Sequence, residues 1–228
     1  DAYVSLSSEI LPEFREFERM STVAVNAFVG PRMGSYLQRF RKRVADVGIP
    51  AAPYTIHSNG GLMSIDTVYA SPVRTCVSGP AAGVVGAAEI GRVAGLPNLI
   101  TFDVGGTSTD VSLIDNCTPL FTSARLVAGY PVKTPMLDIH VIGAGGGSIA
   151  AIDDAGSMKV GPRSAGAAPG PVAYGRGGTE PTITDANLCL GRLDATTLLG
   201  GRMQIDLEAA RRVIREAIAE PLGISLEA

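Results

Sequence analysis

The sequence predicts an α/β protein, and three observations lead to this prediction. Apolar residues recur at three- and four-residue spacing near both ends of the chain, which is typical of amphipathic helices. Short apolar segments between these regions end in glycine-containing turns, as strands do. Two such segments, 98–104 and 109–114, flank a turn at 105–108. We therefore expect a strand–turn–strand unit near the middle of the chain, with helices before and after it.

Proline, glycine and capping side chains indicate where the first helices begin and end. A first helix is expected near Ser8, with Pro12 in its first turn. A second is expected to begin at Pro31 and to stop at Gly48. Residues 80–95 are rich in Ala, Val and Gly and predict a buried helix that another element can approach closely.

Apolar segments bounded by turn residues predict further strands. They lie at 54–57, 118–128, 136–142, 148–152 and 157–160. Residues 161–181 are rich in proline and glycine, and we expect them to form an ordered loop. Two more helices are expected, one after Thr184 or Asp185 and one after Asp206, because these side chains cap helix N-termini.

The composition excludes several classes of protein. Of 228 residues, 46% are hydrophobic and 18% are charged, which is typical of a folded globular chain. The net charge is −3, so nucleic acid and anionic membranes are not expected as partners. No apolar run approaches the roughly 20 residues of a membrane span. The three cysteines are far apart, which argues against a disulfide framework or zinc site and favours a reducing, cytoplasmic location.

The turn between the two central strands has the composition of a phosphate-binding loop. Glycines at 105 and 106 let backbone N–H groups approach phosphate oxygens, and Thr107 and Ser108 add hydroxyl donors. The flanking Asp103 and Asp110 would repel phosphate unless Mg²⁺ lay between them, and either acid could also orient an attacking water. The alternative is a glycine-containing hairpin with solvated acids. The turn is not a P-loop, because no Gly-Lys-Ser/Thr follows it.

A second glycine-rich turn follows the strand expected at 136–142. Three consecutive glycines, Gly145, Gly146 and Gly147, precede Ser148 and could offer a backbone-lined surface to a flat or anionic ligand. A dinucleotide fold is disfavoured, because the residues that follow read as a strand where that fold needs a helix. A purely structural glycine turn remains the alternative.

The two histidines and one cysteine were weighed as further site residues. Asp138 and His140 are expected on one face of a strand, where they could form an acid–base or ligand pair near the substrate. His57, at a strand end, could line a pocket, and Cys76 could act as a nucleophile. For all of them a structural role is the favoured alternative.

Six segments in order along the chain resemble the hydantoinase A / 5-oxoprolinase family. They are Leu11–Arg19, Ser58–Met63, Ser78–Ala87, Asp103–Asp110, Gly143–Ala150 and Pro181–Asn187. The family includes ATP-dependent hydantoinases, 5-oxoprolinases and subunits of ketone carboxylases.

The resemblance implies a ribonuclease-H-like fold of the actin, sugar-kinase and chaperone-ATPase superfamily, a mixed sheet with flanking helices that binds ATP and Mg²⁺ between two halves. Residues 98–228 would then be the second half, and residues 1–97 would be connecting helices with a short strand. The matching phosphate turn of a first half is not found, so we expect a fragment of a larger protein.

The resemblance also implies a function. The expected activity is ATP-dependent opening of a cyclic amide such as a hydantoin or 5-oxoproline, with the fragment inactive on its own. Asp103 and Asp110 would manage Mg²⁺ or water, Gly105–Ser108 would hold phosphate, and Gly145–Ser148 would line the nucleotide. The expected partner is a hydantoinase B-like subunit or a C-terminal domain. Alternatives are a subunit of an ATP-dependent ketone carboxylase and a non-catalytic nucleotide-binding or assembly module.

Overall fold

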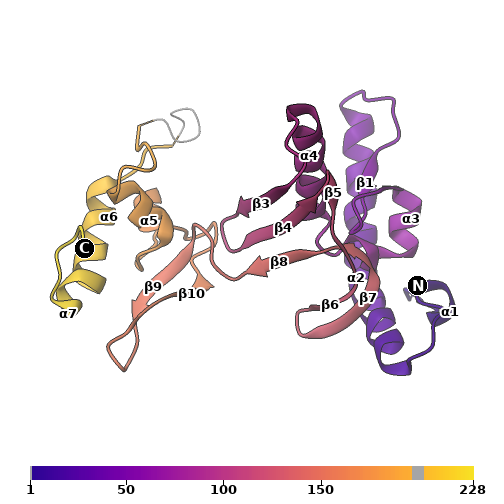
Figure 1. The fold of residues 1–228 in the computed structure, drawn as a ribbon, viewed down its shortest axis with the longest axis horizontal. Coiled ribbons are helices and arrows are strands. Elements are labelled where there is room, and N and C mark those ends of the chain that lie inside the picture. Colours follow the sequence, from indigo (N-terminus) through magenta and orange to yellow (C-terminus); the bar gives the residue numbers. More distant parts are fainter. Residues whose placement is uncertain (1, 197–202) are drawn as a thin grey trace. The chain divides into compact units, whose positions relative to one another are not determined.

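The computed structural model describes residues 2–196 and 203–228, and its contacts divide the chain into two compact units (Figure 1). Unit 1 comprises Asp1–Thr101 and Ser112–Ile139, and unit 2 comprises Phe102–Val111 and His140–Ala228. This division does not coincide with the predicted boundary after residue 97, because Ser112–Ile139 groups with the N-terminal residues. The assignment of 98–228 to half of an ATPase fold stays a prediction.

The helices of unit 1 lie mostly in its N-terminal part. They are α1 (Ser7–Ile10), α2 (Glu16–Asp46), α3 (Ile65–Ala70), a 3₁₀ turn (Pro72–Thr75) and α4 (Ser78–Ala94). Pro12 was expected in the first turn of α1, but it lies after the end of this helix. The helix predicted over 80–95 is confirmed.

The prediction that a helix begins at Pro31 was wrong, because α2 runs through this residue. Asn26, Gly30, Gly34 and Leu37 form a buried stripe that continues across the proline, whereas Pro31 itself is exposed. Packing along this stripe holds the helix together even though the proline cannot donate a backbone hydrogen bond. Tertiary contacts therefore override the local preference.

In the described residues the strands form four small sheets. The antiparallel pairs are β1 (Tyr54–Ile56) with β2 (Leu62–Ser64), β6 (Phe121–Val127) with β7 (Tyr130–Leu137), and β9 (Ser148–Ile152) with β10 (Met158–Ser164). The fourth sheet has the order β3 (Leu99–Val104), β4 (Thr109–Asp115), β5 (Thr118–Pro119), and β8 (Ile139–Ile142) also pairs with β4. The strand–turn–strand prediction is thus confirmed.

The single strand expected over 136–142 is two strands that meet at Asp138. The N–H of Asp138 donates to Leu120 O (2.8 Å), and its carbonyl accepts from Ser112 Oγ (2.8 Å). The chain changes partner at this residue, because β7 pairs with β6 and β8 pairs with β4. Most of β7 was missed by the sequence prediction.

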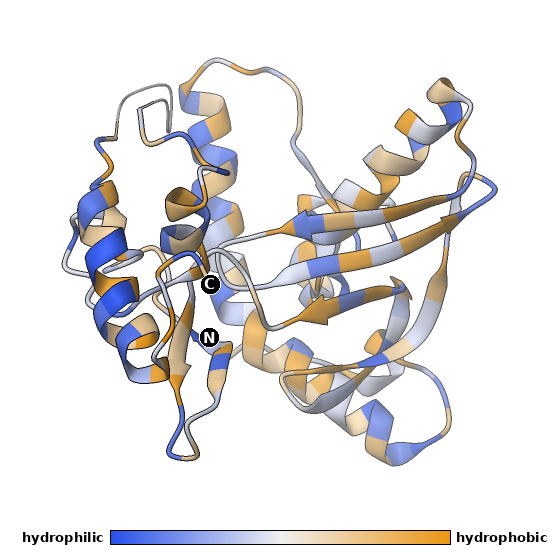
Figure 2. Cartoon of the chain, turned by 60° about the vertical axis from the view of Figure 1, so that its left-hand side comes forward, coloured by the Kyte–Doolittle hydropathy of each residue, from blue (hydrophilic) through white to orange (hydrophobic). Residues whose placement is uncertain are grey.

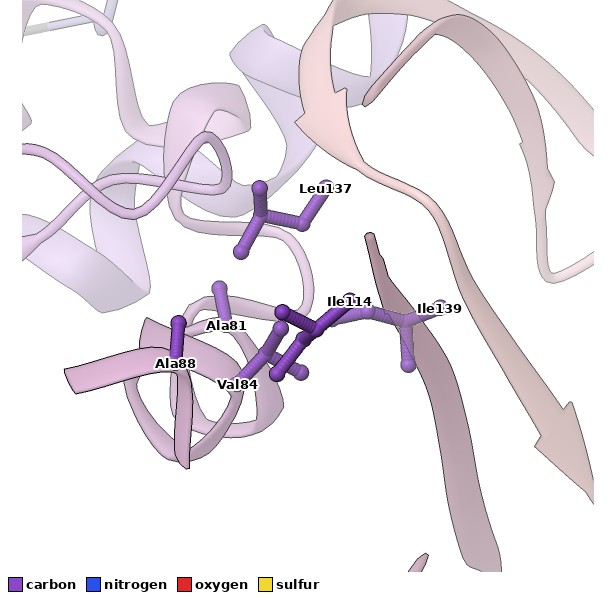
Figure 3. Packing of buried hydrophobic residues seen from close by; sticks show 6 residues of the cluster. All are labelled: Ala81, Val84, Ala88, Ile114, Leu137 and Ile139. Carbon is purple, nitrogen blue, oxygen red and sulfur yellow. The ribbon is translucent and has the colours of Figure 1, made fainter. Parts of the chain in front are cut away.

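The core of unit 1 packs α4 against the sheet. Small side chains of α4, Ala81 and Ala88, lie with Val84 among apolar residues of three strand segments (Figure 3). The strand-side members of this cluster are Ile114, Leu137 and Ile139. Because alanine side chains are small, the backbone of α4 can approach the strands closely, as the composition of 80–95 predicted.

Unit 2 joins the β9–β10 hairpin to short C-terminal helices. These are a 3₁₀ turn (Val172–Tyr174), α5 (Ile183–Cys189), α6 (Leu207–Ile214), a π turn (Arg215–Ala219) and α7 (Glu220–Leu222). Thr182 and Asp185 form a capping box at α5, and Asp206 Oδ1 accepts the N–H of Ala209 (2.8 Å) at α6. Both predicted helix starts are confirmed to within three residues, with Thr182 as the cap of α5 in place of Thr184 or Asp185.

Candidate functional site

The predicted phosphate turn lies between β3 and β4 and is closed by a hydrogen bond from Gly105 N–H to Ser108 O (2.9 Å). In Figure 2 both strands are mainly hydrophobic in colour, with a hydrophilic segment next to the turn. Asp103, near the end of β3, is exposed, and Asp110, near the start of β4, is partly buried. The structure therefore places a carboxylate at each end of the turn.

The second glycine turn, Gly143–Ser148, packs directly on the first. Gly146 N–H donates to Gly105 O (2.9 Å), and Gly147 N–H donates to Gly106 O (2.6 Å). The hydroxyl of Thr109 closes the contact by donating to Ala144 O (2.6 Å). Two segments separated by about forty residues thus form one interlocked pair of turns, which we call the double glycine turn.

Glycine is required where the two turns touch. A Cβ added to Gly145 would lie 2.7 Å from Gly105 O and 2.8 Å from Ser108 N. Both distances are shorter than any ordinary van der Waals contact, and both partners are backbone atoms that cannot rotate away. Gly145 therefore brings one backbone against another, which gives this glycine a structural role beside the predicted contact with a nucleotide.

Ser148 hydrogen-bonds within the double glycine turn. Gly145 N–H donates to Ser148 Oγ (2.8 Å), and Ser148 is completely buried. Ser148 therefore supports the turn from within. Direct contact of Gly145–Ser148 with a nucleotide stays a prediction.

The outer face of the double glycine turn is open. Gly106 and Thr107 are exposed, and in the described part of the chain their backbone N–H groups donate to no protein acceptor. Two free amides and a hydroxyl beside two glycines form a set of donors suited to an anion. The role of Gly105–Ser108 in holding phosphate stays a prediction, and the N–H of Gly105 is not available for it because it donates to Ser108 O.

Thr184, at the start of α5, anchors the double glycine turn. Its backbone N–H and its Oγ1 both donate to Gly146 O, each at 2.8 Å. The helix start is held in turn by buried Asp185, whose carboxylate accepts from Thr182 N and Oγ1 and from Ala173 N. Sequence reasoning took Thr184 only as a helix cap, because nothing local to it indicates the distant glycine turn.

Asp103 and Asp110 are the candidate metal ligands. Among the described residues no group of three or more His, Cys, Asp or Glu side chains lies close enough to hold a metal ion. A pair of carboxylates still fits Mg²⁺, which commonly takes one or two protein carboxylates and completes its octahedron with water and phosphate oxygens. The donor set therefore suits a metal that arrives with a nucleotide.

Asp138 and His140 are both exposed, and buried Ile139 lies between them. Asp138 lies at the break between β7 and β8. They also fall in different units. Their pairing and their role beside a substrate stay predictions.

His57 and Cys76 are placed as structural residues. Burial, with the nearby Arg74 cation, lowers the pKa of His57, and its Nδ1 accepts the N–H of Asn59 (2.9 Å). Burial raises the pKa of the Cys76 thiol, which disfavours the reactive thiolate. Ser58 Oγ, between them in sequence, donates to Arg74 O (2.7 Å) and Cys76 O (2.5 Å). These residues hold the loop after β1.

The helices were also tested for membrane insertion. In the part of the chain that the structure describes, none is both long and apolar enough to span a bilayer.

Comparison with known proteins identifies relatives over the whole chain. Residues 19–228 match the family described as Hydantoinase/oxoprolinase. The chain is 43% identical over 227 residues to caprolactamase subunit alpha of Pseudomonas jessenii, covering 100% of this chain and 33% of that protein. It is 39% identical to the acetophenone carboxylase gamma subunit of Aromatoleum aromaticum, covering 97% of this chain and 30% of that protein.

Two solved structures of related enzymes are also similar to this chain. Nucleotide-free acetone carboxylase superposes with a TM-score of 0.87 at 30% identity, covering 97% of this chain and 31% of that chain. The ATP-dependent caprolactamase from Pseudomonas jessenii superposes with a TM-score of 0.78 at 43% identity, covering 97% of this chain and 32% of that chain. The 228 residues thus span about a third of the length of these relatives.

Proposed function

Because the chain belongs to the hydantoinase/oxoprolinase family, we propose that it supplies the phosphate-binding half of an enzyme that couples ATP hydrolysis to the opening of a cyclic amide. One observation carries this proposal. The double glycine turn exposes the amides of Gly106 and Thr107, and Asp103 of β3 and Asp110 of β4 flank these residues in sequence. Phosphate and its metal counter-ion need these two kinds of group side by side.

Asp103 and Asp110 would hold Mg²⁺ directly or through water. The metal would neutralise the charge that builds up on the phosphate oxygens. The turn residues do the rest of the work in the proposal. The N–H groups of Gly106 and Thr107 orient the transferring phosphate, and the buried bonds behind them keep that orientation without reorganisation during the reaction.

Amides react poorly with water, and in the proposed reaction ATP activates the amide by phosphorylating its oxygen. The amide oxygen attacks the γ-phosphorus of ATP, the bond to the bridging oxygen breaks, and ADP leaves. Water adds to the activated ring carbon, the C–N bond breaks as nitrogen takes up a proton, and a second water releases inorganic phosphate. One ATP, one amide and two waters give one ADP, one phosphate and one amino acid.

The proposal also covers the fold and the partner subunit of the enzyme that would contain this chain. Residues 98–228 would form half of a ribonuclease-H-like ATPase fold, the remaining jaw coming from other parts of the enzyme. A second subunit is included because relatives are named as subunits. The three cysteines are free of disulfides, which agrees with a reducing, cytoplasmic location.

A ketone carboxylase subunit is the second candidate. Its support is the TM-score of 0.87 to acetone carboxylase, against 0.78 to caprolactamase. The two candidates differ in their co-substrates, because carboxylation of a ketone consumes the ketone and a source of carboxylate such as bicarbonate. A cyclic-amide hydrolase needs neither.

The test measures ATP hydrolysis by the protein that contains this chain, assembled with its partner. We expect 5-oxoproline or 2-pyrrolidinone to stimulate phosphate release with matching amounts of ring-opened product. Asp103→Asn should lower this rate by about 100-fold or more, the usual effect of losing a group that stabilises transition-state charge. Exposed Asp154 in the β9–β10 turn provides the control substitution Asp154→Asn, which should leave the rate unchanged. Unaltered turnover in Asp103→Asn would refute the assigned site.

A further inference from the structure

Unit 2 contains a hollow of about 460 Å³ between the β9–β10 hairpin and the loop that follows it. The volume lies in the range of about 300–1,000 Å³ typical of small-molecule sites. Its apolar wall includes Ile149 and Ala168, and its polar groups come from Arg163, Thr179 and Glu180. Most of this wall belongs to the segment that the sequence indicated only as an ordered loop.

The hollow is adjacent to the double glycine turn. Gly147 O accepts the N–H of Ala165, a lining residue, at 2.8 Å. A Cβ added to Gly147 would lie 2.9 Å from Gly106 O and 2.9 Å from Ser164 Oγ, another lining residue. Gly147 thus touches the phosphate turn and the wall of the hollow at once. A molecule in the hollow would be one residue away from the proposed phosphate site.

The charges of the hollow cancel. Arg163 donates to both carboxylate oxygens of Glu180, at 2.6 Å and 3.4 Å. No other charged side chain lines the hollow in the described part of the chain. A ligand carboxylate would have to compete with Glu180 for the guanidinium and would lie beside a like charge, whereas a neutral polar ligand faces neither cost.

We propose that this hollow binds the ring of the amide substrate and that it selects a neutral cyclic amide over one that carries a carboxylate. The inference rests on the proposed function and deepens it by naming the class of substrate. The apolar wall would cover the methylene groups of the ring. Exposed polar groups at the rim, such as the hydroxyl of Thr179, would face the amide edge.

Two matched ligands test the charge preference. 2-Pyrrolidinone and 5-oxoproline share one five-membered lactam ring and differ by a single carboxylate. We expect the protein that contains this chain to bind 2-pyrrolidinone about tenfold more tightly, a ratio equivalent to ~1.4 kcal/mol. Glu180→Gln frees the guanidinium of Arg163 and should strengthen 5-oxoproline binding about tenfold, while 2-pyrrolidinone binding stays within about twofold. An unchanged ratio of the two affinities would overturn the proposal, as would failure of both rings to bind the wild type.

A filling substitution tests the location. Thr179→Phe places a large ring in the hollow and should weaken 2-pyrrolidinone binding more than about tenfold while leaving Mg·ATP affinity unchanged. Ala155→Phe, in the exposed β9–β10 turn, is the control and should change neither affinity. If Mg·ATP binds and Thr179→Phe leaves lactam affinity intact, this inference fails alone. If the wild type binds lactam but not Mg·ATP, the proposed function fails instead.

Discussion

Substituting Gly145 by alanine should separate the two turns at the candidate site. The new methyl carbon would have to move by several tenths of an ångström to relieve contacts of 2.7–2.8 Å with Gly105 O, Ser108 N and Thr107 C. Overpacking of this kind costs about 1–3 kcal/mol. The hydrogen bonds from Gly146 and Gly147 to the phosphate turn would lengthen or break, each worth about 1 kcal/mol. If both bonds are lost, we therefore expect a loss of about 3–5 kcal/mol in unfolding free energy.

Chemical denaturation and Mg·ATP titration on the same samples measure the two consequences of Gly145→Ala. The expected result is a lower denaturation midpoint together with weaker Mg·ATP binding. Gly83→Ala is the matched control, because Gly83 lies within α4 and an added Cβ there meets nothing within 4 Å. It should stabilise the protein slightly, by up to about 1 kcal/mol. Wild-type stability and affinity in Gly145→Ala would refute the interlocked geometry.

Two further substitutions follow from the same contacts. Thr184→Val removes the Oγ1 donor to Gly146 O but keeps the backbone donor. The free energy of unfolding should therefore fall by about 0.5–1.5 kcal/mol and the KM for ATP should rise, while Thr184→Ser should restore both values. An unchanged KM in Thr184→Val would contradict the proposed anchoring of Gly146 by Thr184. His57 has a lowered pKa in the folded state, so unfolding takes up a proton between the folded pKa and the unfolded value of about 6.5. Stability should therefore fall as the pH drops below about 6.5, and His57→Gln should flatten this part of the denaturation profile; an identical profile would contradict it.

The local features of the fold could be predicted from the sequence. Alternating apolar segments around 105–108 indicated two strands and a turn, and Asp206 marked the start of a helix; both are present. These signals depend on neighbouring residues only. Pro31 was misinterpreted for the same reason, since the buried stripe that carries α2 through it depends on packing with distant residues.

The candidate site was predictable in its residues but not in its assembly. The glycines and acids of 103–110 indicated phosphate chemistry directly. Gly146 and Gly147 donate their N–H groups to the first turn, and Thr184 holds Gly146, through contacts between segments about forty residues apart. A glycine needed for backbone contact and a glycine needed for a ligand look the same in a sequence. Only the structure distinguishes them.

The central claim is that the turn at 103–110 binds a nucleotide phosphate through its amides and its acids together. Calorimetric titration of the protein that contains this chain with ATP, with and without Mg²⁺, tests it most directly. The account predicts binding that Mg²⁺ strengthens by about tenfold or more, and loss of that dependence in Asp103→Asn. Equal affinity with and without the metal, or an Asp103→Asn variant that binds like the wild type, would contradict it.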